Sequence, residues 1–307
     1  AVITDLDPNQ IFILEAKCKA SQLPEHVKSF LLLKGYGHIY EHVSTKSPSK
    51  WGYAGVICFS KEKATSVFEG VGDLHMDQEG RALTLQFENK VVSGYYFPNA
   101  GKPGELITLG KKIEYMKQYN KFLSTRIPKN LPLLIGGDSN VARRDQDKYD
   151  NVSSEHNKAN PSCTKEERTA LHELVTDMDI TDQIERFQDK PEHTWFLNPR
   201  DRYANKGMRI DHIFANKEMH NTIKYATTTI STYGSDHRAM VVINKTNKMW
   251  DIMKEHGQPE WLTPCSQVFG MEGIDEDLFQ ASMEITDKIN AVKQDLHTQG
   301  MAHSKIK

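Results

Sequence analysis

A short stretch of the chain, "LLIGGDSNVARRD" at residues 133–145, places a carboxylate and a carboxamide directly after a run of apolar residues. Asp138 and Asn140 stand one residue apart there. Side chains at positions i and i+2 of an extended backbone point to the same side, so we expect both groups to face one point beyond the strand. A carboxylate beside an amide suits the holding of a water molecule against a hard cation. An Asx turn that merely caps the strand end explains this short motif about as well.

Polar side chains that could do chemistry also follow or interrupt other apolar runs of the sequence. They are Glu15 after "IFIL", Tyr96 and Asn99 in "YYFPNAG", Asp211 in "RIDHIF", and Asp236 and His237 in "GSDHRAM". Each motif alone is a weak signal, but layered α/β proteins place their ligand sites at the sheet edge where strands end. We therefore expect these side chains to converge on one site.

The residue types limit the chemistry of such a site. The sequence has no Cys/His cluster with zinc spacing and no glycine-rich loop ending in Lys-Ser or Lys-Thr. Carboxylates with Asn and His favour Mg²⁺, with Mn²⁺ as the alternative, and such ions in turn favour a phosphate substrate. Hydrolysis of a phosphodiester needs an activated water molecule, neutralised charge and a stabilised leaving oxygen, and the set has a candidate for each task.

Short strand patterns mixed with helix patterns predict a layered α/β fold that positions these residues. Apolar stripes predict a helix over residues 111–125, and the pair Thr164 and Glu167 forms a capping box ahead of a second helix. Expected strands cover residues 11–15, 53–59, 81–87, 90–96, 131–136, 208–215 and 238–243.

The sequence pattern of mixed strands and helices ends after residue 244. We therefore divide the chain into a main domain at 1–244 and a C-terminal extension at 245–307, in which apolar spacing predicts an amphipathic helix at 277–297. That helix either packs back on the domain or binds a protein partner.

The net charge of −2 does not by itself indicate a nucleic-acid binder. The sequence has no apolar window long enough to span a membrane and no signal peptide, so we expect no membrane contact. Four scattered cysteines without metal spacing favour an intracellular protein, nuclear in a eukaryote and otherwise cytoplasmic.

Taken together and in order, these motifs resemble those of the exonuclease III / apurinic-apyrimidinic (AP) endonuclease family, within the endonuclease/exonuclease/phosphatase superfamily. "ILEAKCK" resembles its LQETK motif, "EGRALTLQF" its EGR strand, and "YYFPNAG" its Y-x-PN-G motif. "GGDSNVARRD" is similar to its GD-x-NVA motif and "GSDHRAM" to its GSDH motif. The resemblance covers roughly residues 10–243. It implies a four-layered α/β sandwich (α+β), with two packed β-sheets flanked by helices and here a helical C-terminal tail.

The resemblance also implies a Mg²⁺-dependent DNA repair nuclease that cuts double-stranded DNA 5′ to abasic sites, with 3′–5′ exonuclease or 3′-phosphodiesterase activity alongside. Tyr96 would contact the scissile phosphate, and Asp138 would activate a water molecule that Asn140 orients. His237 would stabilise the phosphoryl oxygens, with its tautomer held by Asp211.

Further roles follow from the same resemblance. Glu15 and Asp236 would lie at the metal together with Asp138 and Asn140. Asn99, Arg81 and Arg209 would hold the DNA. Trp195, Met208 and Ile210 would line an apolar pocket for the flipped abasic nucleotide. The family often carries an aromatic residue where Met208 stands, so we expect a softer and less selective pocket.

One departure from the family pattern leaves alternatives open. The family begins with a strand that ends in Asn about 25 residues before the glutamate of its LQETK motif, and this sequence has only 14 residues before Glu15. We therefore expect that strand, with one metal-site residue, to be absent from these residues. The alternatives are a retrotransposon-type nicking endonuclease, another phosphoesterase of the same fold, and a catalytically impaired DNA-binding protein.

Overall fold

A six-stranded sheet with the strand order β4-β5-β6-β7-β9-β8 forms one of the two inner layers. β6 and β7 are parallel, and every other neighbouring pair is antiparallel. The computed structural model describes residues 2–46, 53–149, 160–189, 192–202, 204–229 and 235–262. The strands of this sheet are β4 (Ser66–Glu69), β5 (Ala82–Gln86), β6 (Val91–Tyr96), β7 (Leu133–Asp138), β8 (Ile180–Asp182) and β9 (Asp211–Asn216).

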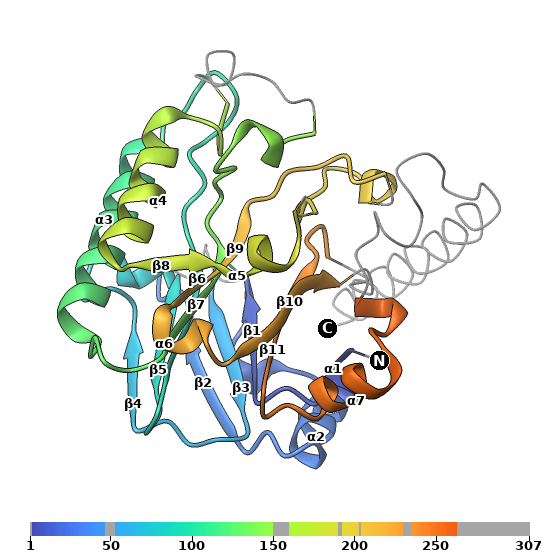
Figure 1. Cartoon of the computed structure of the whole chain (residues 1–307). Helices are drawn as coiled ribbons and strands as arrows, with labels where there is room; N and C mark the ends of the chain where they lie inside the picture. The colour runs from blue at the N-terminus through green and yellow to red at the C-terminus, as the bar shows by residue number, and fades with distance from the viewer. Residues whose placement is uncertain are drawn as a thin grey trace, which may run out of the picture.

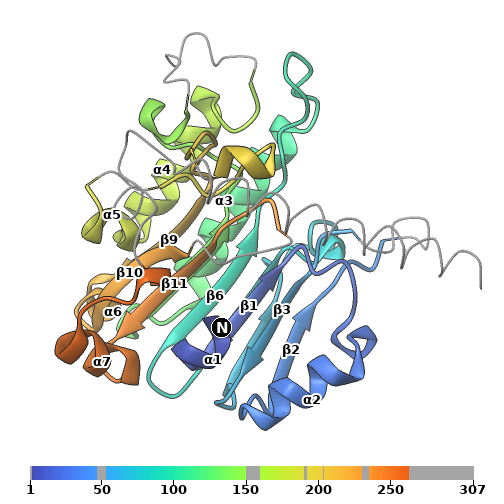
Figure 2. The same ribbon diagram turned by 90° about the vertical axis from the view of Figure 1, so that its right-hand side faces the viewer.

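The second inner layer consists of two smaller sheets that lie in front of β6 in Figure 2. The first has the order β1-β3-β2, and the second pairs β10 with β11. Their strands are β1 (Gln10–Leu14), β2 (His38–His42), β3 (Val56–Ser60), β10 (Ile223–Thr229) and β11 (Ala239–Asn244). Among the described residues, β1 pairs only with β3 and β11 only with β10, so each strand has one unpaired edge.

Helices cover both outer faces, as Figure 1 shows. α3 (Leu109–Arg126) and α4 (Lys165–Asp177) pack on the six-stranded sheet, and α2 (Glu25–Leu33) packs on the three-stranded sheet. α1 (Val2–Leu6) and α7 (Lys248–His256) pack beside β10 and β11. Two short helices, α5 (Gln183–Phe187) and α6 (Lys217–His220), flank β9. The predicted four-layered α/β sandwich is therefore confirmed.

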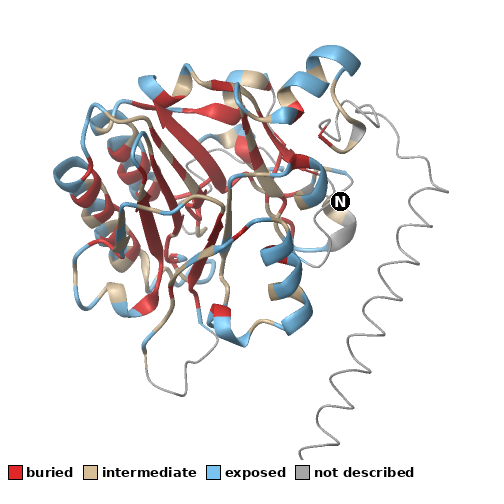
Figure 3. Ribbon diagram, turned by 90° about the horizontal axis from the view of Figure 1, so that it is seen from below, coloured by how far each residue is buried: buried red, intermediate tan, exposed pale blue. Residues whose placement is uncertain are grey.

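Buried apolar side chains form clusters between the layers. Figure 3 shows that much of the buried chain lies in the strands. The predicted stripe of the first long helix is confirmed, because Met116, Tyr119, Phe122 and Leu123 are buried against β6 and β7. Burial of such a face stabilises the fold by about 25 cal/mol per Å² of apolar surface. The capping box at Thr164 is also confirmed. The Thr164 side chain accepts a hydrogen bond from the Glu167 amide and caps the N-terminus of α4.

All seven predicted strands are present with shifted ends, and four strands escaped prediction. These four are β2, β4, β8 and β10. β4 and β8 have only 4 and 3 residues. β10 reads "IKYATTT", where threonines supply β propensity without an apolar alternation. No helix among the described residues is long and apolar enough to cross a membrane.

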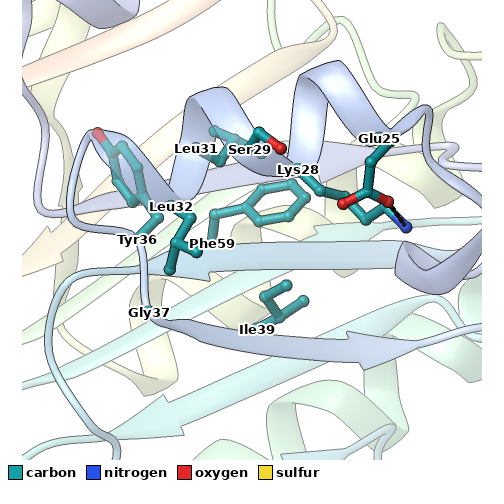
Figure 4. Close-up of a pocket in the computed structure, with 9 residues that line it drawn as sticks. All are labelled: Glu25, Lys28, Ser29, Leu31, Leu32, Tyr36, Gly37, Ile39 and Phe59. Carbon is teal, nitrogen blue, oxygen red and sulfur yellow. Dashed lines mark ion pairs between the residues drawn. The ribbon is translucent and has the colours of Figure 1, made fainter.

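The described part of the C-terminal extension packs back on the domain. Met249 of α7 and Leu262 are buried together with Val241 and Ile243 of β11. The segment at 277–297 lies outside the described residues, so its helix and its role in binding a partner stay predictions. A separate cavity of about 190 Å³ lies between α2 and the strands β2 and β3, and it shares no lining residue with the predicted site (Figure 4).

Candidate active site

Three of the predicted residues stand in one row across neighbouring strands of the large sheet. Tyr96 is the register partner of Asp138 in the parallel pair β6–β7, and Asp138 is the partner of Asp211 in the antiparallel pair β7–β9. β6 and β7 end at this row and β9 begins there. The expected convergence of strand-end polar groups is therefore confirmed for these three residues.

The strand that carries Asp138 passes very close to its neighbour at Gly137. A Cβ atom at this position would lie 1.8 Å from the carbonyl oxygen of Tyr95. Only glycine allows the two backbones to approach in this way. Gly137 thus sets how closely β7 lies against β6.

His237 lies against Asp211 just before the start of β11. Its Nδ1 is 2.8 Å from Oδ2 of Asp211, and because a carboxylate only accepts, the ring donates. Burial lowers the pKa of His237, but the charge and hydrogen bond of Asp211 and the charges of Asp138 and Asp236 outweigh it and raise the pKa to about 10. Burial in turn opposes ionisation of Asp211, but His237 holds the pKa of that carboxyl below its usual value. The pair is therefore an imidazolium–carboxylate pair at neutral pH.

Asp138 behaves differently from its neighbour Asp211. Only 4% of each residue is exposed. Burial and the adjacent charge of Asp211 raise the pKa of Asp138 to about 7, against the opposing charge of His237. A carboxyl group whose pKa lies near neutrality can accept and return a proton at physiological pH. Asp138 is thus the member of the row that is suited to proton transfer.

Asn140 reaches Asp138 by a turn and not by the extended backbone that we expected. β7 ends at Asp138, and Asn140 has the left-handed φ of 52°. Its amide nitrogen donates to Oδ1 of Asp138 at 2.7 Å, and its Nδ2 donates to Oδ2 at 3.1 Å. The Asx-turn alternative is therefore present, and it serves to fix the carboxylate. Nδ2 of Asn99 donates to Oδ1 of Asn140 at 3.2 Å, which joins Asn99 to the same group.

Glu15 contacts the side chain of Tyr96. It follows β1 directly, adopts a left-handed φ of 49°, and forms an ion pair with Lys17 at 3.0 Å. Burial raises the pKa of Tyr96 well above its usual value, and the charges of Glu15 and Asp138 raise it further. The Tyr96 hydroxyl is therefore protonated, and in this structure it is hydrogen-bonded to Glu15.

The residues predicted for the abasic pocket form one apolar cluster next to His237. Trp195 and Met208 pack with buried Ile210, and the backbones of Trp195 and Met208 exchange hydrogen bonds of 2.9 Å. The indole Nε1 of Trp195 donates to Oδ2 of the exposed Asp236 at 3.1 Å. Asp236 thus lies at the rim between this cluster and His237, whose pKa it helps to raise.

The two predicted DNA-binding arginines are buried, which corrects our picture of surface contacts. Arg81 is 2% exposed, is ion-paired with Glu79 at 2.7 Å and lies over the ring of Tyr96. Arg209 is fully buried and paired with Asp182 and Glu185. Buried guanidinium groups that carboxylates already hold are suited to positioning their neighbours and not to binding phosphate. Their role in holding DNA is therefore indirect at most in this geometry.

One residue of the site escaped prediction. The Thr194 hydroxyl oxygen accepts hydrogen bonds from the amides of Ile210 and Asp211, each at 3.1 Å. It thereby fixes the start of β9 and the backbone of Asp211. A threonine before a tryptophan carries no recognisable signal in the sequence, because its partners lie 16 and 17 residues away.

The donor set fits a divalent cation. Ligand atoms of Asp138, Asp211 and His237 all lie within 4.8 Å of one another. Oδ2 of Asp211 already accepts the hydrogen bond of His237. Glu15, the other predicted carboxylate ligand, is not a member of this group. Oxygen donors of this kind suit Mg²⁺ or Mn²⁺, and excess negative charge at Asp138 favours a cation there.

Comparison with known proteins shows the family of this chain. The model of the "Endonuclease/Exonuclease/phosphatase family" matches residues 1–237. The chain is 29% identical to an exodeoxyribonuclease of Bacillus subtilis over 208 residues, which covers 65% of this chain and 76% of that protein. It is 26% identical to a DNA-(apurinic or apyrimidinic site) endonuclease of Dictyostelium discoideum over 246 residues. This match covers 78% of this chain and 64% of that protein.

A solved structure shares the fold of this chain. The fold matches that of an AP endonuclease from Archaeoglobus fulgidus with a TM-score of 0.67 at 19% identity, over 80% of this chain and 91% of that one. At this identity the likeness concerns the fold alone. The family model covers most of the chain, residues 1–237. The chain therefore belongs to the endonuclease/exonuclease/phosphatase family.

Proposed function

We propose that this protein is a Mg²⁺-dependent DNA repair nuclease that hydrolyses the phosphodiester 5′ to abasic sites in double-stranded DNA. Trimming of 3′ ends, as exonuclease or phosphodiesterase, accompanies this activity. The observation that carries the proposal is the group of Asp138, Asp211 and His237 at one edge of the large sheet. The similar proteins from Bacillus and Dictyostelium, named as an exodeoxyribonuclease and an AP endonuclease, support it.

Each residue of the group has a task in hydrolysis. Asp138, with a pKa of about 7, accepts the proton of the attacking water molecule. The imidazolium of His237 donates a hydrogen bond to a phosphoryl oxygen, and Asp211 keeps the ring oriented. The protonated Tyr96 donates to the same phosphate from the neighbouring strand.

Glu15 and Asp138 would hold the cation, with Asn140 and Asp236 beside them. A divalent ion there would neutralise charge on the phosphate and its leaving oxygen. The surrounding residues do the positioning: Asn140 fixes the carboxylate of Asp138, and Arg81 with Glu79 packs below the Tyr96 ring.

The cluster of Trp195, Met208 and Ile210 supports the choice of an abasic substrate. An apolar surface beside the phosphate site accommodates a sugar that lacks a base better than a polar nucleotide. The methionine in this cluster adapts its shape, which predicts modest selectivity against intact nucleotides.

The proposal is tested with a labelled duplex that contains one abasic-site analogue, in Mg²⁺ and in EDTA. We expect incision on the 5′ side in Mg²⁺ only. Asp138→Asn should lose incision by about 10³-fold while it binds the duplex in EDTA like the unchanged protein. Faster cleavage of intact DNA or of phosphate esters unrelated to DNA would instead favour another enzyme of the same fold. Binding without any cleavage would favour the DNA-binding alternative.

A further inference from the structure

A fully buried lysine lies directly beneath the turn that carries the proposed catalytic carboxylate. Lys112 belongs to α3, and its Nζ donates to the backbone carbonyl oxygen of Asn140 and to Oε1 of Glu167, both at 2.5 Å. Lys112 and Glu167 are both 0% exposed. Lysine is almost never fully buried without a specific reason, because the loss of hydration is costly.

Glu167 is itself held rigidly at the N-terminus of α4. Its Oε1 accepts from the Ser162 amide at 3.0 Å, and its Oε2 accepts from the Thr164 amide at 3.0 Å and the Thr164 hydroxyl at 2.8 Å. These hydrogen bonds fix the position of the Glu167 carboxylate. Lys112 of α3 therefore links the fixed carboxylate of Glu167 in α4 to the turn after β7.

The contact with the Asn140 carbonyl oxygen distinguishes this lysine from a simple link between two helices. A bond to Glu167 alone would join α3 and α4. The Asn140 carbonyl belongs to a residue in the left-handed region, a conformation that needs support from its surroundings. The amide and side chain of that same residue hold both oxygens of Asp138. A shift of the Asn140 peptide would therefore turn the Asp138 carboxylate.

The side chain of Lys112 carries its charge at a position where it is 0% exposed. An apolar residue of similar length would fill the space at a lower desolvation cost. Packing alone therefore does not explain a cation at this position.

We propose that Lys112, anchored by Glu167, is a positioning residue that holds the Asn140 turn and thereby aims the Asp138 carboxylate for hydrolysis. This inference rests on the proposed nuclease function. Lys112 touches neither substrate nor cation in this arrangement, so its effect must pass through Asn140.

The test uses the double variant Lys112→Met/Glu167→Gln, which removes both charges and leaves no lone buried ion. We expect kcat for an abasic duplex to fall by about 30-fold or more, since a misplacement near 1 Å can cost about 10²-fold. KM and duplex binding in EDTA should stay within about threefold, because no DNA contact is removed. A crystal structure of the variant should show the Asn140 peptide displaced and the Asp138 carboxylate rotated.

A matched control separates positioning from stability. Leu123→Ala truncates another fully buried residue of α3. Measured well below its unfolding midpoint, it should lower thermal stability and keep kcat within about threefold. Two results would overturn the proposal: an unchanged kcat in the double variant, or an equal loss in Leu123→Ala. If the unchanged protein cleaves no DNA, the nuclease proposal fails, and an undisplaced Asn140 in the crystal structure would still refute the role of Lys112.

Discussion

Nδ1 of His237 donates a hydrogen bond to Oδ2 of Asp211 at 2.8 Å, across 26 residues of sequence. This bond leaves Nε2 as the ring nitrogen that can act on a substrate. It also fixes the ring where the strands β7 and β9 meet, because Asp211 is the register partner of Asp138. The proposed proton transfer at Asp138 and the proposed charge stabilisation at His237 are thereby linked by the pairing of β7 with β9.

Asp211→Asn should impair cleavage by loss of this orientation. An amide can present its NH₂ group to Nδ1 and so favour the wrong tautomer, which in a comparable carboxylate–imidazole pair costs about 10⁴-fold. We expect a fall of about 10²-fold or more in the single-turnover rate on an abasic duplex. Nitrogen NMR of the ring should show that Nδ1 of His237 is protonated in the unchanged protein and altered in the variant. A variant that cleaves at the normal rate would contradict the assignment.

Glu15→Gln should weaken cation binding. Removal of one anionic ligand commonly costs about 10-fold or more in affinity, so the Mg²⁺ concentration for half-maximal cleavage should rise by that factor. Calorimetry with Mn²⁺ in the absence of DNA measures the same loss without activity. Glu25→Gln is the control, because Glu25 is a mostly exposed glutamate of α2 paired with Lys28. Equal Mn²⁺ affinity in both variants would place the cation elsewhere.

Glu79→Gln should reveal a pH-dependent contribution to stability. Burial opposes its ionisation, but hydrogen bonds from Lys111, Lys46 and Arg81 lower the pKa of Glu79 to about 2. A carboxyl group whose pKa is lowered by folding stabilises the fold at pH values above its pKa in the unfolded chain, about 4.5. This contribution is lost as the pH falls toward 2. We expect a loss of about 2 kcal/mol at pH 7, less than the full shift implies because Lys111 reaches solvent.

The difference in free energy of unfolding between the unchanged protein and Glu79→Gln should therefore shrink between pH 5 and pH 3. Urea unfolding at each pH measures it. Glu69→Gln, at an exposed position of β4, should show almost no difference at either pH. A difference for Glu79→Gln that stays constant over this range would mean that its ion pairs do not act as described.

Met208→Phe should sharpen the choice of substrate. A rigid ring in place of the methionine would fit less easily around an intact nucleotide, and one such change in an apolar pocket is worth about tenfold in selectivity. We expect the ratio of abasic incision to cleavage of intact DNA to rise by about that factor. Met253→Phe, a similar change at a half-buried position of α7, should leave the ratio unchanged. A fall in the ratio would show that Met208 does not line the pocket.

The sequence by itself predicted seven of the strands, the helix α3 and the residues of the candidate site. Apolar runs interrupted by Gly, Pro and Asp located seven strands, and the stripe from Met116 to Leu123 located α3. These signals are local, because strand and helix periods repeat within a few residues. The short strands β4 and β8 and the threonine-rich β10 lack such a period and were missed.

Only the tertiary structure decided how the site is assembled. The row of Tyr96, Asp138 and Asp211 depends on the registers of β6, β7 and β9, which no local pattern encodes. The environment of Arg209 is likewise not encoded locally. We predicted from the sequence that this residue binds DNA, but in the folded chain it is ion-paired with buried carboxylates. Lys112 carries no signal at all, since its partners Asn140 and Glu167 lie 28 and 55 residues away. Contacts at such separations are set by the packing of whole layers. For this reason the chemical character of each residue could be predicted from the sequence, but the residues that surround it in space could not.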